Sequence, residues 1–150
     1  MSRPHHPHHA RQWSRRLAMQ AIYQWQMTAQ DLVEIERQFY TDENLHKADL
    51  SYFRELLHQV PAHLEELDMR LGKHLDRPVA EVDPVERAVL RNGCYELIYR
   101  RDIPYKVVIN EAIRLTKKFG AEHGYRFING VLDGVVKDLH KSSATSSPQR

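Results

Sequence analysis

One stretch of sequence, from Pro104 to Asp133, constrains the fold more than any other. Its first half repeats apolar residues at helical steps of four, three and four: Val108, Ala112, Leu115 and Phe119. Its second half, continued to Leu139, carries two neighbouring apolar rows: Phe127, Val131 and Val135 beside Ile128, Leu132, Val136 and Leu139. Two helices with broad apolar faces and a short turn between them predict a helical hairpin that packs against the rest of the chain.

The residues at the helix ends agree with this hairpin. Pro104 suits the first turn of a helix, because its missing N–H would find no helical partner there. Gly120 is expected to end the first helix in the left-handed conformation, which costs glycine least. Gly130 and Gly134 lie four residues apart on the second helix, so we expect a neighbouring helix backbone to approach there.

A second helical seam runs from Leu50 to Leu75. Its apolar residues alternate steps of three and four: Leu50, Phe53, Leu57, Val60, Leu64, Leu67, Leu71 and Leu75. Such a seam could form a coiled coil between chains, but in a domain of this size we expect a core helix. Pro61 is expected to kink this helix or divide it, since proline removes a backbone hydrogen bond and crowds the carbonyl four residues back.

Another helix is predicted to begin at Asp83, Pro84 and Glu86, which supply an N-cap acid, a first-position proline and a third-position glutamate. Its apolar side includes the single cysteine, Cys94, which we expect to be a buried thiol. The charged residues of this helix are expected outside: Arg87, Arg91, Glu96 and Arg100. Glu86 has two interpretations, as a capping residue or as a surface acid available to a protein partner.

The helix predicted near the start of the chain, over residues 10 to 28, has an unusual outer face. Opposite its apolar arc it carries no acid: Gln12, Arg15, Arg16, Met19 and Tyr23. Arginine and aromatic side chains are what single-stranded RNA binders use for phosphate contacts and for stacking. Either this face binds RNA, or its arginines are neutralised by acids elsewhere in the fold.

The distribution of charge narrows the class of partner. Residues 1 to 30 contain four arginines and no acid, whereas residues 31 to 70 contain ten acids against four Lys and Arg. A basic N-terminal element favours an anionic partner, nucleic acid before membrane. No apolar run reaches the ~20 residues of a membrane span and the N-terminus has no signal-peptide core, so we expect a cytoplasmic protein.

Every predicted segment is helical and none shows the alternation of a β-strand, so the predicted fold class is all-α. We expect a disordered His-rich tail at residues 1–9, one helical domain at 10–140 and a disordered tail at 141–150. The chain has no phosphate-binding glycine loop, zinc motif or recognisable nucleophile. We therefore expect no enzymatic activity, no cofactor and no metal site.

Five segments carry a family resemblance. They are RRLAMQAIYQWQ near the start, YFRELL at 52–57, ERAVLRNGCYEL at 86–97, IPYKVVINEAIRLTKKFG at 103–120 and FINGVLD at 127–133. In this order they resemble the NusB transcription antitermination factor family, over a span from about Arg11 to Leu139. The resemblance implies about seven helices in two packed sub-bundles, and a protein that is not an enzyme.

The resemblance also implies partners. Members of this family pair with the small-subunit ribosomal protein that doubles as the NusE factor, and the pair binds the boxA element of nascent RNA. With other Nus factors it helps RNA polymerase pass terminators, notably in ribosomal RNA operons.

By position, the resemblance assigns RNA contacts to the start of the first helix and to two residues of the hairpin: Arg11, Gln12, Arg15, Arg16, His123 and Phe127. For Phe127, a core position and an RNA-facing position both remain open. His123 stands where an acid is common in the family, and this change either makes RNA affinity depend on pH or has no effect.

Contacts to the protein partner are assigned to Tyr23 and Glu86, with which we group Met19 and Arg91. The rival hypothesis is a homodimer in which an exposed row, formed by Met19, Tyr23 and Met27, masks the arginine face. This protein would have a structural or regulatory role.

Overall fold

A computed structural model describes the backbone of residues 7–146 and the side chains of residues 7–142. The helices are α1 (Pro7–Thr28), α2 (Leu32–Phe39), η1 (Leu45–Lys47), α3 (Leu50–Ala62), α4 (Leu64–Gly72), η2 (Val79–Glu81), α5 (Pro84–Tyr99), α6 (Tyr105–Phe119) and α7 (Gly124–Ser146), where η marks a 3-10 helix. No strand occurs within residues 7–146, so the all-α prediction is confirmed. None of these helices is long and apolar enough to cross a membrane.

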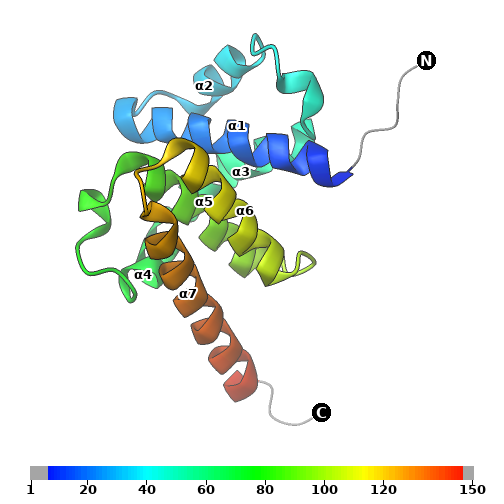
Figure 1. Cartoon of the computed structure of the whole chain (residues 1–150). Helices are drawn as coiled ribbons and strands as arrows, with labels where there is room; N and C mark the ends of the chain where they lie inside the picture. The colour runs from blue at the N-terminus through cyan, green and yellow to red at the C-terminus, as the bar shows by residue number, and fades with distance from the viewer. Residues whose placement is uncertain (1–6, 147–150) are drawn as a thin grey trace.

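The helices form two groups that share α5. In one group α1, α2, α3 and η1 pack together, and in the other α4, α6 and α7 pack around α5, which also contacts α1 and α3. Figure 1 shows α1 and α2 at one end of the molecule and α7 extending away at the other. The predicted arrangement of two packed sub-bundles is confirmed.

The central helix, α5, is enclosed on every side. All residues from Ala88 to Leu97 are buried, which is a longer run than one face of a helix can provide. Cys94 lies within this run, and burial raises the pKa of its thiol to about 12. The prediction of a buried thiol is confirmed, but two of the four charged residues that were expected outside, Arg91 and Glu96, lie in the same buried run, whereas Arg87 and Arg100 are half-buried.

The long apolar seam is divided near Pro61, as predicted. α3 ends at Ala62 and α4 begins at Leu64, with His63 between them at φ −111° and ψ 20°. The seam supplies fully buried residues on both sides of the break, including Phe53 and Leu67. It therefore forms internal core.

The turn between α6 and α7 differs from the prediction. Gly120 caps α6 in an extended conformation, with φ −92° and ψ −174°, and is not left-handed. The left-handed residue of this turn is His123, with φ 69°. His123 directly precedes α7, so the left-handed residue lies three positions later in the chain than expected.

The close approach of helices predicted on α7 also lies elsewhere. Gly130 is exposed, with open space where a Cβ would lie. Gly134 is covered by the ring of His74, a side chain and not a helix backbone. A close contact between helices at a glycine occurs at Gly93 of α5, where an added Cβ would lie 3.1 Å from Cδ1 of Leu132, a side chain of α7.

Helical structure extends into both predicted tails. Within the described residues, α1 runs from Pro7 and α7 runs to Ser146. The predicted domain limits at residues 10 and 140 therefore fall inside helices. The remaining parts of the two predicted tails, residues 1–6 and 147–150, lie outside the described residues.

Candidate nucleic-acid interface

Arg15 lies inside the molecule and not on an exposed face. Only 4% of its surface is exposed, and its Nε donates to both carboxylate oxygens of Glu96 at 3.0 Å. Glu96, on α5, is 2% exposed and also accepts a hydrogen bond from the hydroxyl of Tyr52 on α3. The expectation that Arg15 is exposed is therefore wrong. For this arginine, neutralisation by an acid elsewhere in the fold is the correct interpretation.

The pairing with Glu96 keeps this buried arginine charged. Burial, the strongest influence on the pKa of Arg15, lowers it, but the nearby carboxylate of Glu96 more than offsets this effect and the pKa is raised overall. Met19, one turn further along α1, is 2% exposed and belongs to the core. Arg15 and Met19, which were both predicted on the outer face of the first helix, thus pack inside the molecule.

The other predicted residues of the first helix reach the surface where α1 meets α6. Arg11, Gln12 and Arg16 are all half-buried. The amide nitrogen of Gln12 donates to Glu111 on α6 at 2.9 Å, which ties the two helices together. The guanidinium carbon of Arg11 lies 4.8 Å from the ring centroid of Tyr52. Two of the three predicted arginines therefore remain at the molecular surface.

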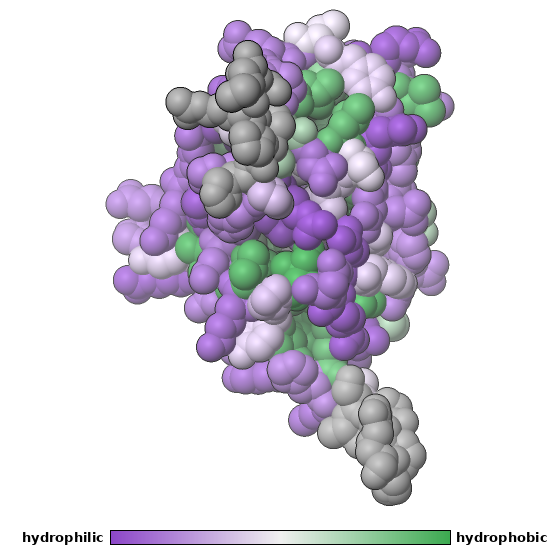
Figure 2. All heavy atoms as spheres, turned by 90° about the vertical axis from the view of Figure 1, so that its right-hand side faces the viewer, coloured by the Kyte–Doolittle hydropathy of each residue, from purple (hydrophilic) through white to green (hydrophobic). Residues whose placement is uncertain are grey.

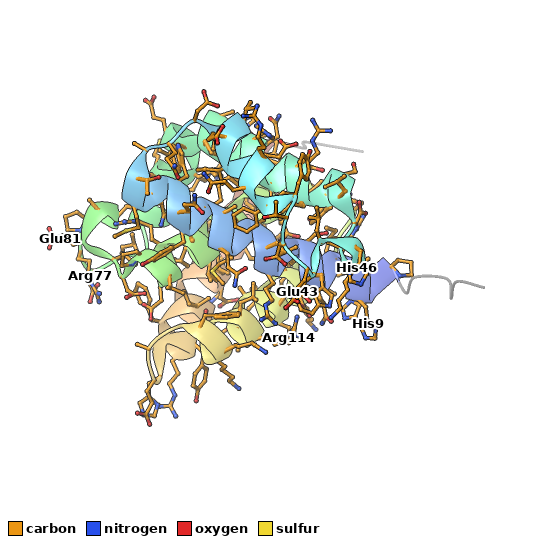
Figure 3. The ribbon with its side chains drawn as sticks, turned by 90° about the horizontal axis from the view of Figure 1, so that it is seen from above. His9, Glu43, His46, Arg77, Glu81 and Arg114 are labelled. Atoms are coloured by element: carbon orange, nitrogen blue, oxygen red, sulfur yellow. The ribbon has the colours of Figure 1, made fainter. Side chains whose placement is uncertain are left out.

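A groove of about 100 Å³ runs along this edge and is here called the α1–α6 groove. It is lined by Gln12, Trp13, Arg16, Arg114, Leu115 and Lys118. In Figure 3 the labelled Arg114 of α6 lies beside the N-terminal half of α1, on the side of the loop that carries the labelled Glu43 and His46. That loop contributes Lys47, whose ammonium lies 4.8 Å from the centroid of the Trp13 ring.

The lining of the α1–α6 groove is basic and aromatic, which suits an anionic ligand with flat rings. Trp13, Lys47, Arg114 and Lys118 were not among the residues predicted from sequence. They come from three separate elements, so no local spacing connects them. Within the described residues, no group of three or more His, Cys, Asp or Glu side chains is placed to hold a metal ion.

Further along α1, the outer side becomes less charged. Tyr23 is 37% exposed and Met27 is 55% exposed, although both are large hydrophobic residues. Exposed aromatic and methionine side chains are enriched at protein interfaces. The exposed row predicted for a homodimer therefore retains Tyr23 and Met27 but loses Met19, because Met19 is buried, and of Tyr23 and Met19 in the predicted partner contacts only Tyr23 is exposed.

Glu86 is buried beneath the α6–α7 turn. It is 6% exposed, and its carboxylate accepts a hydrogen bond from the backbone N–H of Ala121. The carboxylate also lies where a side chain on Gly124 would collide with it. The N-cap function belongs to Asp83, whose carboxylate accepts from the backbone N–H of Glu86 at 3.1 Å. Of the two interpretations of Glu86, that of a surface acid is therefore wrong, since its carboxylate is buried against the turn that carries His123.

Arg91 is likewise buried, at 8% exposed. Its Nε and Nη2 bind the two carboxylate oxygens of Asp68 on α4, at 3.0 and 2.9 Å. Its Nη1 donates to the side chain of Gln26 on α1 at 3.0 Å. This residue, expected outside, links three helices, because α5 is enclosed on all sides.

The two predicted residues of the hairpin differ in exposure. His123 is exposed, and its Nε2 lies 3.6 Å from the carboxylate of Glu122. Phe127 is half-buried and packs against the core, and the guanidinium carbon of Arg77 lies 5.2 Å from its ring centroid. The ring of Phe127 therefore has one side against the core and a cation near its outer surface.

Comparison with known proteins adds an independent line of evidence. Residues 12–137 match the model of the NusB family. The chain belongs to the NusB family. Two similar relatives are each named Transcription antitermination protein NusB: the one from Shewanella amazonensis is 51% identical and the one from Shewanella loihica is 50% identical, each over 126 residues. Both matches cover 84% of this chain and 94% of the relative.

Solved structures of NusB proteins share the fold. A structure of antitermination factors NusB and NusE in complex with dsRNA matches with a TM-score of 0.76 and 28% identity, over 85% of this chain and 96% of that chain. NusB from T. maritima matches with a TM-score of 0.73 and 26% identity, over 92% and 94% of the two chains. This member of the NusB family is thus a transcription antitermination factor with an all-α fold.

Replacing Arg15 by Met is expected to destabilise the protein by about 3–5 kcal/mol, because it leaves the carboxylate of Glu96 buried without its partner. Urea unfolding followed by circular dichroism measures this loss. The matched control is the double variant Arg15→Met, Glu96→Gln, which removes the charge but keeps an acceptor for Tyr52. It should recover part of the loss, and an equal or larger loss would show that the ion pair is not the cause.

The burial of Glu86 predicts a pH-dependent stability. Burial, and then the charge of Asp83, raise the pKa of Glu86, so the folded state binds this proton more tightly than the unfolded state. Between the unfolded and folded pKa values, the stability of the wild type therefore falls as pH rises.

The variant Glu86→Gln has no carboxyl group at this position and so cannot bind this proton. Its free energy of unfolding minus that of the wild type should therefore increase from about pH 4 to about pH 7. Urea unfolding at several pH values measures the difference, with Glu65→Gln on the exposed side of α4 as the control. A difference that decreases over this range would contradict the raised pKa.

Proposed function

We propose that this chain is an RNA-binding adaptor that pairs with the NusE ribosomal protein and, as that pair, binds the boxA element of nascent ribosomal transcripts. In this proposal it acts with RNA polymerase and other Nus factors in the cytoplasm, without a cofactor and without catalysing a reaction. The observation that carries the proposal is the basic and aromatic α1–α6 groove. The structural relative that contains NusB, NusE and dsRNA supports the same class of partners.

RNA would bind along the edge where α1 meets α6. Arg16, Arg114 and Lys118 line the groove there and can reach phosphates, and Arg11, which lies outside the groove over the ring of Tyr52, would contact a neighbouring phosphate. Gln12 would support this surface through its hydrogen bond to Glu111. Phosphate contacts of this kind position the RNA and make the affinity depend on salt.

The buried charged residues would support the RNA surface from within. Arg15 would hold α1 against α5 and would not itself contact RNA, since it is buried and its Nε and Nη2 bind Glu96. At the other end of the surface, His123 would contact RNA from its exposed position on the α6–α7 turn. Phe127 would do so through the outer side of its ring, after Arg77 moves away from it.

The protein partner would bind the outer side of the C-terminal half of α1. Tyr23 and Met27 are the exposed apolar residues there, at 37% and 55%. Glu86 and Arg91, being buried, would act indirectly by fixing the α6–α7 turn and the position of α5. The same two exposed residues favour the second candidate, a homodimer formed through α1 that has a structural or regulatory role.

Replacing Arg16 by Glu tests the RNA surface. The variant should bind boxA RNA in the presence of NusE about tenfold or more weakly, and the dependence of affinity on salt should become less steep by about one ion or more. Fluorescence anisotropy with labelled RNA at several salt concentrations measures both quantities. Arg37→Glu, an exposed arginine on α2, makes the same change of charge away from the groove and is the control. Equal losses in the two variants would mean that only net charge matters.

Replacing Tyr23 by Ala tests the partner face. We expect the affinity for NusE to fall about tenfold, since a partly exposed tyrosine is a typical interface anchor. Analytical ultracentrifugation with and without NusE measures this, with Tyr105→Ala as a control of matched exposure, 39% against 37%. A wild-type homodimer that NusE does not dissociate, and that Tyr23→Ala does dissociate, would favour the second candidate.

A further inference from the structure

We propose that Trp13 is a stacking platform for one unpaired base and that it gives this protein a preference for single-stranded over double-stranded RNA. The inference rests on the proposed RNA-binding function and adds to it a residue and a basis for specificity. The experiment described below can contradict this role of Trp13 while still confirming that the protein binds RNA.

Packing in the hydrophobic core does not explain the presence of a tryptophan at position 13. The partly buried hydrophobic residues that pack against the core include the other tryptophan, Trp25, as well as Phe119, but not Trp13. Trp13 is half-buried and lines the α1–α6 groove. An aromatic ring that is partly exposed, and that is not needed for packing, is available for a ligand.

The contacts of Trp13 are with cations. The guanidinium carbon of Arg16 lies 4.7 Å from its ring centroid, and the ammonium of Lys47 lies 4.8 Å from it. Arg16 also lies 5.0 Å from the ring centroid of Phe119 on α6, so it contacts aromatic rings on two helices. Cations over an aromatic ring are attracted by its negative face, and here they hold the ring in place before a ligand arrives.

These two cations have different freedom to move. Arg16 is half-buried and held by two rings, whereas Lys47 is exposed at the end of the short helix η1. A base that stacks on Trp13 would replace the ammonium of Lys47, whose flexible stem lets it turn to the phosphate of the same nucleotide. Arg114 and Lys118 line the rest of the groove and would contact neighbouring phosphates.

This mode of binding requires an unpaired base. In a duplex, the faces of each base are covered by the bases above and below it, whereas an unpaired base can turn out and offer a face to an aromatic ring. Phosphate contacts alone do not discriminate between the two forms in this way. Trp13 therefore supplies discrimination between single and double strands, and the surrounding cations supply affinity.

The test compares one RNA sequence in two forms, as a labelled single strand and annealed to its complement, each titrated by anisotropy with the full chain alone and with NusE. In Trp13→Leu, which keeps apolar bulk but removes the ring, single-strand binding should weaken about tenfold and duplex binding less than about twofold. Trp13→Phe, which keeps an aromatic face, should remain within about threefold of the wild type for both forms. The matched control is Tyr105→Leu, an exposed aromatic residue on another part of the surface.

A second measurement follows the ring directly. The chain has two tryptophans, so Trp25→Phe leaves Trp13 as the single tryptophan. Single-stranded RNA should quench its fluorescence, and duplex RNA should do so much less. Circular dichroism melting confirms that each variant is folded.

Three outcomes would overturn the proposal. Unchanged single-strand affinity in Trp13→Leu, or an equal loss for both forms of RNA, would show that Trp13 does not stack on an unpaired base while leaving the proposed RNA-binding function intact. No binding of either form by the wild type, alone or with NusE, would overturn both this inference and the proposed function.

Discussion

The ion pair between Arg15 and Glu96 is the interaction on which the arrangement of this molecule depends. Two charges buried at 4% and 2% exposure are stable only if each satisfies the other, because an unpaired charge in the interior costs several kcal/mol. The guanidinium meets both carboxylate oxygens, and Tyr52 adds a hydrogen bond from α3. One carboxylate on the central helix therefore fixes α1 and α3 together.

The position of α1 in turn determines the candidate nucleic-acid interface. Arg16 follows Arg15 directly, so the orientation that buries one side chain directs the next toward α6 and the ring of Phe119. Trp13 and Gln12 lie on the same edge and line the same groove. The position of the proposed RNA surface is thus a consequence of core packing. A substitution of Arg15 or Glu96 would displace this surface, although neither residue lines the α1–α6 groove. This separates residues that would contact RNA from residues that position them.

Residue patterns in the sequence were sufficient to predict an all-α fold, and the family resemblance implied the two sub-bundles. Apolar periodicity predicted the helices, and specific residues predicted their limits, such as Asp83 at the start of α5 and Pro61 near the division of the long seam. The prediction failed for the outer face of the first helix, which was expected to be exposed. A helix that packs against several others can bury a polar side as well as its apolar side. The acid that satisfies Arg15 lies 81 residues away, and no spacing reveals it. The same enclosure explains why Arg91 of α5 is buried.

The sequence predicted only some of the residues of the candidate site. Periodicity brought Arg16 and Tyr23 to one side of the first helix, and both are at the surface, although their roles remain predictions. The cations that surround Trp13 could not be predicted, since they come from a loop and from α6 as well as from α1. Glu86 could not be assigned correctly either, because the backbone N–H that it binds belongs to a turn 35 positions later in the chain.

The distance along the chain between Arg15 and Glu96 also bears on how the protein is made. A ribosome synthesises α1, α2 and α3 well before it reaches α5, so the N-terminal sub-bundle emerges with the partner of Arg15 still missing. Closing an 81-residue loop is entropically costly, and the carboxylate that binds Arg15 lies on α5. The ion pair between Arg15 and Glu96 can therefore form only after α5 has been synthesised.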